Sequence, residues 1–330
     1  MKLGILDQIP IPEHSGATDA IQQSIRLAQI AEQLGYHRYW LAEHHNTKLL
    51  ASSAPEVTIA HMAARTERIR VGSGGIMSMH YSALKIAEVF NTLSALSPGR
   101  IDLGIGRAPG GDTPSILALA QGRPAPFDDQ YDKIRAVMDL ISGERSELPE
   151  YSNVRAAPVG VALPEVWLLG STGNSARQAG ELGVGYAFAQ FFNGEASREI
   201  FDAYRRHFKP SAFMEKPRIL VTYAATVADT EEEAEFRARP IDLFRLGIRT
   251  GNFRPIYSPE KASEIKLSAM EEMLIRHGRA LHLVGTPGQV AEQIMRDKEA
   301  FGFDECMINA NHGTIGHRID TFRLLAQALS

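Results

Sequence analysis

The chain has 330 residues, of which 44% are hydrophobic and 22% are charged, and its formal net charge is -4. This composition is typical of a globular protein with a sizeable core, and it lacks the basic excess of a nucleic-acid-binding protein. No apolar run approaches the roughly 18 residues that a membrane span needs, and no export signal is recognisable at the amino terminus. Cys306 is the single cysteine of the sequence, so no internal disulfide can form. We therefore expect a cytoplasmic protein with neither nucleic acid nor membrane among its partners.

Short apolar runs of strand length alternate with helical patterns along the chain. The helical pattern at residues 17–34 places Ile21, Ile25 and Ala28 on one stripe, which should pack against a sheet. Eight strands separated by helices favour parallel connections. We therefore expect one α/β domain over residues 1–330, a closed (β/α)8 barrel rather than an open doubly wound sheet. The predicted strands are 3–9, 38–42, 69–76, 101–105, 166–169, 186–189, 218–227 and 305–310, and the predicted helices include 17–34, 55–65, 82–96 and 176–182.

Three segments interrupt this alternation and predict insertions on the rim of the barrel. Residues 107–128 and 249–259 are rich in Gly and Pro and are expected to be loops of the functional rim. Residues 147–164 resemble an inserted hairpin, with Val154 and residues 159–161 as strand positions.

The apolar run at residues 39–42 ends abruptly in Glu43, His44 and His45. The carboxyl ends of barrel strands are where such folds keep their chemistry. Successive side chains of a strand point to opposite faces, so only one of the two histidines should face the barrel interior. That histidine could act as a general base or donor near neutral pH, or both could simply hydrogen-bond to neighbouring loops. A metal site is less favoured, because Glu-His-His lacks the spacing of a His-x-x-x-His helix.

The next two predicted strands also end in unusual residues. Glycines at positions 72, 74 and 75 indicate either a close approach of the backbone to a flat ligand or a bulge at a barrel corner. Residues 104–106 begin like a dinucleotide-binding fingerprint, but Pro109 occupies the position of its third glycine, so a nicotinamide site is weakly supported. Arg107 suggests an anionic ligand or a charged flavin ring, with a surface arginine as the alternative.

A fourth motif follows the strand at residues 166–169. Gly170, Ser171 and Thr172 lead into a predicted helix that contains Ser175. Free backbone amides, hydroxyl groups and the positive end of a helix dipole meet there, which is typical of a phosphate-binding site. The same residues would also serve as an ordinary helix cap.

Together these motifs resemble the luciferase-like flavin monooxygenases, the family that contains the bacterial luciferase subunits. The resemblance covers essentially the whole chain and is most specific at residues 39–46, 72–75, 98–110 and 167–171, with further similarity at 283–287 and 303–305. It implies a (β/α)8 barrel that takes reduced FMN from a separate reductase. Such enzymes react the flavin with O2 to a C4a-hydroperoxide, which oxygenates a small organic substrate.

The resemblance also implies roles for individual residues. His44 matches the histidine that assists formation or breakdown of the hydroperoxide, and Gly74 and Gly75 match a pair joined by a non-prolyl cis peptide behind the flavin ring. The cofactor-binding residues implied are Gly74, Gly75, Arg107, Gly170, Ser171, Thr172 and Ser175, and no metal is implied. A homodimer is expected from the family, and the small residues of the helix at 55–65 permit close packing.

Some features of the sequence depart from the family or leave alternatives open. Luciferases carry side chains at the positions of Gly74 and Gly75, and the rim loops differ, so neither the substrate nor light emission carries over. The alternatives are a deazaflavin (F420)-dependent oxidoreductase of the same superfamily, a non-catalytic flavin-binding barrel, and a metal-dependent barrel hydrolase.

Overall fold

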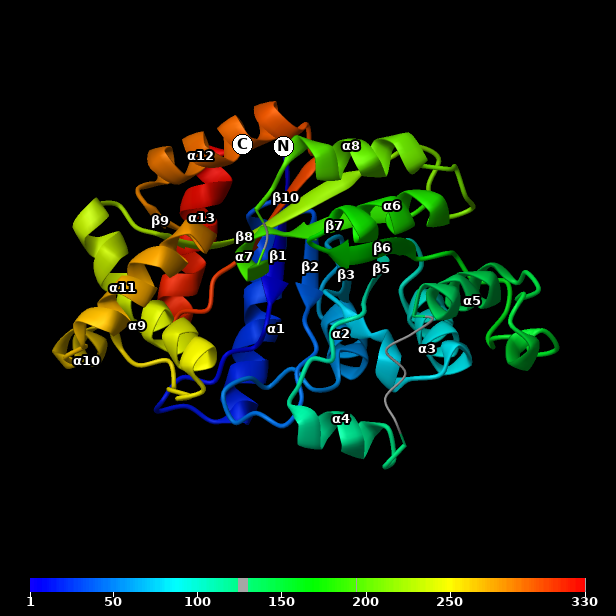
Figure 1. Cartoon of the computed structure of the whole chain (residues 1–330), viewed down its shortest axis with the longest axis horizontal. Helices are drawn as coiled ribbons and strands as arrows, with labels where there is room; N and C mark the ends of the chain where they lie inside the picture. The colour runs from blue at the N-terminus through cyan, green and yellow to red at the C-terminus, as the bar shows by residue number, and fades with distance from the viewer. Residues whose placement is uncertain (124–129, 194, 330) are drawn as a thin grey trace.

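The structure is a computed structural model, and it describes residues 1–123, 130–193 and 195–329. The described residues form a closed ring of eight parallel strands, and Figure 1 shows helices arranged around it. The ring closes because β10 pairs with both β1 and β8. It is the (β/α)8 barrel that the sequence predicts, and each predicted strand corresponds to a strand of the ring. In ring order these are β1 (Lys2–Asp7), β2 (Arg38–Leu41), β3 (Arg70–Ser73), β5 (Ile101–Gly106), β6 (Glu165–Gly170), β7 (Gly185–Ala189), β8 (Ile219–Val227) and β10 (Glu305–Asn309).

The helices begin and end largely where the sequence signals them. Pro55 and Pro287 open helices, Ser82 accepts a hydrogen bond from Lys85 N at 3.1 Å as an N-cap, and Gly35 follows the first helix with φ of +82°. None of the described helices is long and apolar enough to cross a membrane. The helices are α1 (Ala17–Gln33), α2 (Pro55–Ala64), α3 (Ala83–Leu96), α4 (Thr113–Leu119), α5 (Gln130–Ser142), α6 (Gly173–Leu182), α7 (Gln190–Asn193), α8 (Arg198–His207), α9 (Glu231–Thr250), α10 (Pro259–Glu264), α11 (Ala269–Gly278), α12 (Pro287–Phe301) and α13 (Ile315–Ala328).

The barrel has an apolar layer on each side of its strands. The inner layer includes Leu6, Trp40, Trp167 and Met307, and the two tryptophan rings meet edge to face with centroids 5.8 Å apart. The outer layer packs the strands against the helices and contains Cys306, which is fully buried. Burial on both faces explains why the strands are nearly continuous apolar runs.

The amino-terminal end of the barrel is closed by charged side chains. Arg38 is fully buried and contacts Asp102, Glu305 and Glu165, the latter two at 2.7 and 3.2 Å. Arg70 and Arg218 complete the network around the same carboxylates. These arginines lower the pKa of Glu165 to about 2, against the opposing effect of burial. Each of these residues lies at or next to the first residue of a strand, so the network plugs one end of the lumen.

The inserted segments differ in part from the predictions. No strand occurs in the described segment 152–164, so the predicted hairpin is wrong. Val159 is 72% exposed and Pro158 has no N–H to donate, so this segment cannot form a buried hairpin ladder. Instead, the Asn91 side chain holds the segment by donating to two of its backbone carbonyl groups.

The two expected rim loops are partly helical. The segment 107–128 contains α4, and its residues 124–128 lie outside the described residues. The segment 249–259 starts at the end of α9, where Gly251 has φ of +73° and terminates the helix. Sequence reasoning also missed β9 (His282–Gly285), which pairs with the end of β8, and the short strand β4 (Ile76–Met77), which pairs with β5.

Candidate active site

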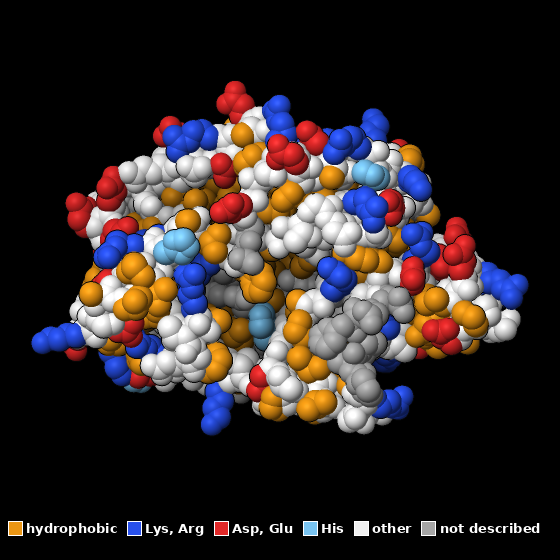
Figure 2. All heavy atoms as spheres, viewed as in Figure 1, with side chains coloured by type: hydrophobic (Ala, Val, Ile, Leu, Met, Phe, Trp, Pro, Cys, Tyr) orange, Lys and Arg blue, Asp and Glu red, His pale blue; other side chains and the backbone are white. Residues whose placement is uncertain are grey.

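The four sequence motifs lie on four consecutive strands of the ring. β2, β3, β5 and β6 are neighbours in that order, although long helical segments separate them in the sequence. Parallel strands end at the same rim of a barrel, so the motifs follow one arc of its mouth. In Figure 2 the molecule is hollowed near its middle, above α4 and beside α9, and a histidine side chain is visible in the hollow.

His44 lies in the loop after β2, and one of its ring nitrogens has no hydrogen-bond partner among the described residues. Its backbone N–H donates to Ser52 O at 2.8 Å, which fixes the chain at this point. Its Nδ1 atom is buried and has no hydrogen-bond partner among the described residues. Burial lowers the pKa of His44 to about 4, and the neighbouring His45 adds to this effect. The imidazole is therefore neutral near pH 7, and its Nδ1 atom retains an unused capacity for a hydrogen bond.

The ring of His45 bonds to Glu43. The Nε2 atom of His45 lies 2.7 Å from Glu43 Oε1, and the Glu43 side chain is fully buried. No group of three or more His, Cys, Asp or Glu side chains that could hold a metal ion occurs in the part of the chain that the structure describes.

The glycine-rich end of β3 is a place of very close backbone approach. The peptide bond between Gly74 and Gly75 is cis, as the resemblance implies. A Cβ atom on Gly74 would lie 2.5 Å from Leu6 Cδ1, and one on Gly75 would lie 2.7 Å from Gly104 O. The close atom at Gly75 belongs to the backbone of β5, so a side chain is excluded there, whereas at Gly74 the end of the Leu6 side chain would have to move.

Arg107 follows β5 and is exposed, with its guanidinium 4.5 Å from the ring centre of Tyr131 in α5. Burial raises the pKa of Tyr131, while the charges of Arg107 and Arg177 oppose that rise. Both guanidinium groups therefore act on the same hydroxyl group. Arg177 belongs to α6, so positive charge from the segments after both β5 and β6 acts on this hydroxyl group.

The segment after β6 forms a reciprocal helix cap. Thr172 Oγ1 accepts from Ser175 N at 3.3 Å, and Ser175 Oγ accepts from Thr172 N at 3.2 Å. The Ser175 hydroxyl is buried and also lies 3.1 Å from the Tyr186 hydroxyl. Ser175 and Thr172 thus organise the first turn of α6, the capping role that the sequence left open.

The cap leaves the exposed residues of this turn free to contact a ligand. Gly170 lies directly against Ser175, because a Cβ atom there would be 2.2 Å from Ser175 Oγ. Residues 172–174 are exposed, and Ser171 is partly exposed. The positive end of the α6 dipole and the guanidinium of Arg107 thus face solvent on neighbouring strand ends, and this arrangement suits an anionic group.

The family model of the luciferase-like monooxygenases matches residues 1–325, almost the entire chain. The chain belongs to this family. It is therefore an enzyme of the oxidoreductase class, as the resemblance implies.

Relatives of this luciferase-like monooxygenase align over nearly their full lengths. A luciferase-like monooxygenase of Escherichia coli (strain K12) is 38% identical over 97% of this chain and 94% of its own. The N-acetyl-S-alkylcysteine monooxygenase of Bacillus subtilis (strain 168) is 36% identical over 93% of this chain and 92% of its own. The crystal structure of apo-MsnO8 is 35% identical, with a TM-score of 0.89 over 99% of this chain and 98% of that one.

Sequence reasoning did not find every residue of the candidate site in this luciferase-like monooxygenase. Tyr131, whose ring supports Arg107, and Tyr81, whose hydroxyl donates to Glu43, lie in or next to helices with no unusual local pattern. Only tertiary contacts mark them. The burial of Glu43 could have been predicted from the sequence, because Glu43 directly follows the apolar run at residues 39–42.

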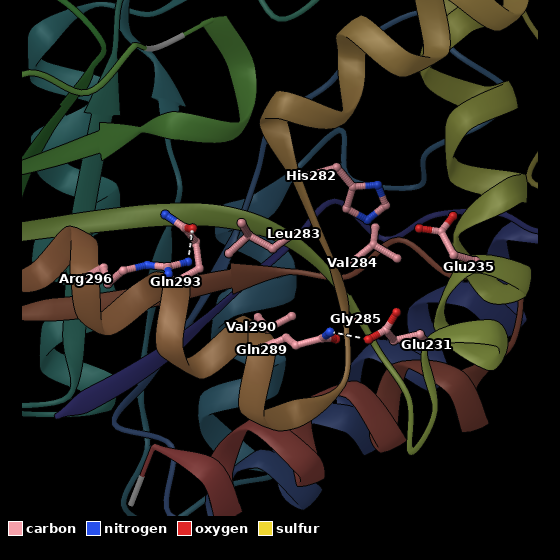
Figure 3. A pocket seen from close by; sticks show the side chains of 10 residues that line it. All are labelled: Glu231, Glu235, His282, Leu283, Val284, Gly285, Gln289, Val290, Gln293 and Arg296. Atoms are coloured by element: carbon pink, nitrogen blue, oxygen red, sulfur yellow. Dashed lines mark hydrogen bonds between the residues drawn. The ribbon is translucent and has the colours of Figure 1, made fainter.

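A second hollow of this luciferase-like monooxygenase, about 390 Å³ in volume, lies outside the ring between α9 and α12. In Figure 3 the ring of His282 points toward Glu235 of α9, while Arg296 lies at the far side. The carboxylates of the hollow already have partners: Glu231 accepts from Gln289, and Glu235 binds Arg279 at 2.9 Å. No chemistry of the candidate site extends into it.

Proposed function

We propose that this chain is an FMN-dependent monooxygenase of the two-component type, which uses O2 to oxygenate a small organic substrate. Bound reduced FMN would supply the two electrons, so that one oxygen atom enters the substrate and the other leaves as water. The observation that carries this proposal is the combination, on one arc of the barrel mouth, of an anion site at Arg107 and α6 with the unpartnered Nδ1 of His44. Family membership supplies the reaction class.

The phosphate of FMN fits the first turn of α6. In this proposal Arg107 provides the opposite charge, while Ser171 and the backbone N–H groups after it donate hydrogen bonds. Gly170, Thr172 and Ser175 keep that turn in shape through their mutual contacts. The flat ring would lie against the backbone of residues 74–75, at the cis peptide that the resemblance associates with the flavin.

His44 is proposed as the residue that exchanges a proton or hydrogen bond with the reacting oxygen. Because burial keeps its imidazole neutral, one ring nitrogen can donate and the other can accept. Burial of this part of the mouth also limits the access of water, which suppresses loss of the activated oxygen as peroxide.

A separate reductase is proposed to supply the reduced flavin. Residues 104–106 lie inside β5 rather than at a strand-to-helix turn, so they do not form a dinucleotide-binding loop. Hydride delivery from a nicotinamide would then take place on another protein. We also propose that residues 1–330 act as one domain and that the enzyme is a homodimer, with the exposed Val57 of α2 in a face that a second copy could cover.

Oxygen consumption coupled to product formation tests the proposed reaction. The purified chain is supplied with an FMN reductase, and a panel of aldehydes, ketones, aromatics and thioethers is screened for product and for hydrogen peroxide. Thioethers are included because one relative is named an N-acetyl-S-alkylcysteine monooxygenase. At least one substrate should convert O2 into product rather than peroxide. Peroxide as the sole product across the panel would contradict the proposal.

His44→Ala tests the proposed role of His44. We expect FMN binding within about 3-fold of the unmodified chain and a substrate-dependent oxygen reaction slowed about 100-fold, the usual size of a lost general acid or base. Stopped-flow absorbance with reduced FMN, O2 and substrate measures the rate. His207→Ala on the exposed end of α8 is the matched control and should behave like the unmodified chain. Coincident traces for His44→Ala would show that the role is wrong.

Titration of the chain with FMN and with deazaflavin F420 separates the main alternative. Tighter binding of FMN supports the proposal, and tighter binding of F420 favours a hydride-transfer enzyme that does not use oxygen. Flavin binding without turnover of any reduced cofactor would favour a non-catalytic barrel.

A further inference from the structure

The Glu43 carboxylate is a meeting point of three donors from separate places in the fold. Oε2 accepts from the Met77 backbone N–H at 2.9 Å, and Oε1 accepts from the Tyr81 hydroxyl and from His45 Nε2, both at 2.7 Å. The carboxylate is fully buried, so these bonds replace the water that it lost. Burial and the charge of Glu43 hold the pKa of Tyr81 well above its usual range, so Tyr81 remains a donor.

His45, held by Glu43, is in turn attached to the segment after β5. The His45 backbone N–H donates to Gly110 O at 2.9 Å. Its ring meets the ring of His80 edge to face, with centroids 5.7 Å apart, and His80 Nε2 lies 2.7 Å from Pro109 O. The next side chain continues the connection, because Asn46 donates to both oxygens of Asp112 at 3.0 and 3.1 Å.

These contacts determine where His44 can point. Glu43 and His45 are two residues apart and bond to each other, so their side chains share one side of the chain. The side chain between them is directed to the other side. The backbone bond from His44 N to Ser52 O ties the segment to the far part of its own loop, between β2 and α2. The direction of His44 therefore depends on the bonds that Glu43 accepts.

We propose that Glu43 is a positioning residue, which holds His45 and the Met77 peptide and thereby directs His44 toward the reacting oxygen. The inference rests on the proposed function, because it assigns Glu43 no contact with substrate or cofactor. It extends that function by naming the group through which the segments after β2, β3 and β5 are held together.

Glu43→Gln is the sharpest variant for a test. A glutamine has a single acceptor end, so it can serve Met77 N–H or the Tyr81–His45 pair, but not both. We expect product formation to slow by about 10- to 100-fold, the effect of a small misplacement of a catalytic group. FMN binding should change less than about 3-fold, because Arg107 is supported by Tyr131 independently of Glu43. Tyr81→Phe, which removes one of the three donors, should show a smaller loss of the same kind.

A double-mutant cycle with His44→Ala decides whether Glu43 acts through His44. If it does, the Glu43→Gln/His44→Ala double variant is no slower than His44→Ala alone. Asp242→Asn serves as the matched control, because Asp242 is another buried carboxylate, bonded to Arg279 at 2.7 Å outside the ring. It should reduce thermal stability while leaving the rate per folded molecule unchanged.

The outcomes separate this inference from the proposed function. Additive losses in the double variant, or an unchanged rate for Glu43→Gln, would overturn the positioning role while leaving the proposed function intact. If His44→Ala itself equals the unmodified enzyme, the proposed role of His44 is wrong and the role of Glu43 fails with it.

Discussion

At the scale of single residues, the candidate site combines one neutral imidazole with one exposed cation. His44 is kept neutral by burial, whereas the guanidinium of Arg107 lies over the ring of Tyr131. The two residues suit different tasks. A neutral histidine can move a proton, and a supported guanidinium can hold a phosphate without changing its own state.

Arg107→Ala should weaken FMN binding by about 10- to 100-fold, the equivalent of one lost charge-assisted hydrogen bond. Riboflavin, which lacks the phosphate, provides the comparison, and its affinity should be nearly unchanged. Fluorescence titration at low and high salt measures both ligands, and the FMN effect should shrink at high salt. Equal losses for FMN and riboflavin would show that Arg107 does not face the phosphate.

At the scale of elements, the first turn of α6 has a structural and a proposed functional task. Its reciprocal cap is repeated at α12, where Thr286 and Gln289 make the same pair of bonds. The two helices therefore allow the stability of a cap to be separated from the binding of an anion.

Thr172→Ala and Thr286→Ala should each lower the free energy of unfolding by about 1 kcal/mol, because each leaves a backbone N–H of the first helical turn unsatisfied. Only Thr172→Ala should also weaken FMN binding, since only α6 is proposed to meet the phosphate. Chemical denaturation and FMN titration of both variants provide the measurements. Equal FMN affinity in the two variants would place the phosphate elsewhere.

At the scale of the whole molecule, the two ends of the barrel have different roles. The amino-terminal end is closed by the Arg38 network, whose removal would leave several carboxylates buried without a partner. The carboxyl-terminal end carries the candidate site. This division matches the general organisation of (β/α)8 barrels, in which one rim supports stability and the other supports catalysis.

Acid should destabilise the whole fold before its carboxylates titrate. Burial lowers the pKa of His37 and His44 to about 4 and that of His312 to about 3. In the unfolded chain these groups titrate near 6.5, so it binds more protons than the folded protein between about pH 6.5 and 4. Stability is therefore full above about pH 6.5 and falls as the pH decreases through this window. The raised pKa of Asp242 acts in the opposite direction.

Thermal denaturation between pH 7 and pH 4 measures this effect. The melting temperature should fall steadily as the pH decreases. His312→Gln should make the free energy of unfolding depend less steeply on pH, by up to the contribution of one proton. A flat profile between pH 7 and pH 5 would contradict the assignment of buried neutral histidines.

The sequence by itself determined the barrel and the positions of its four motifs. Parallel strands covered by helices are apolar along most of their length, so runs such as residues 166–169 are visible without a structure. The motifs are visible because each polar residue directly follows such a run, as Glu43 and Arg107 do. The hairpin predicted at 147–164 is wrong. The valines of this segment are not part of an apolar run like those that mark the barrel strands.

Only the tertiary structure decided which side chains meet. The donors to Glu43 come from 2, 34 and 38 residues away, and the carboxylates around Arg38 from 64, 127 and 267 residues away. Local sequence patterns report burial and periodicity, which depend on near neighbours, but such contacts depend on how the ring closes. For that reason the sequence could name His44 as a candidate, while the residue proposed to direct it emerged only from the folded barrel.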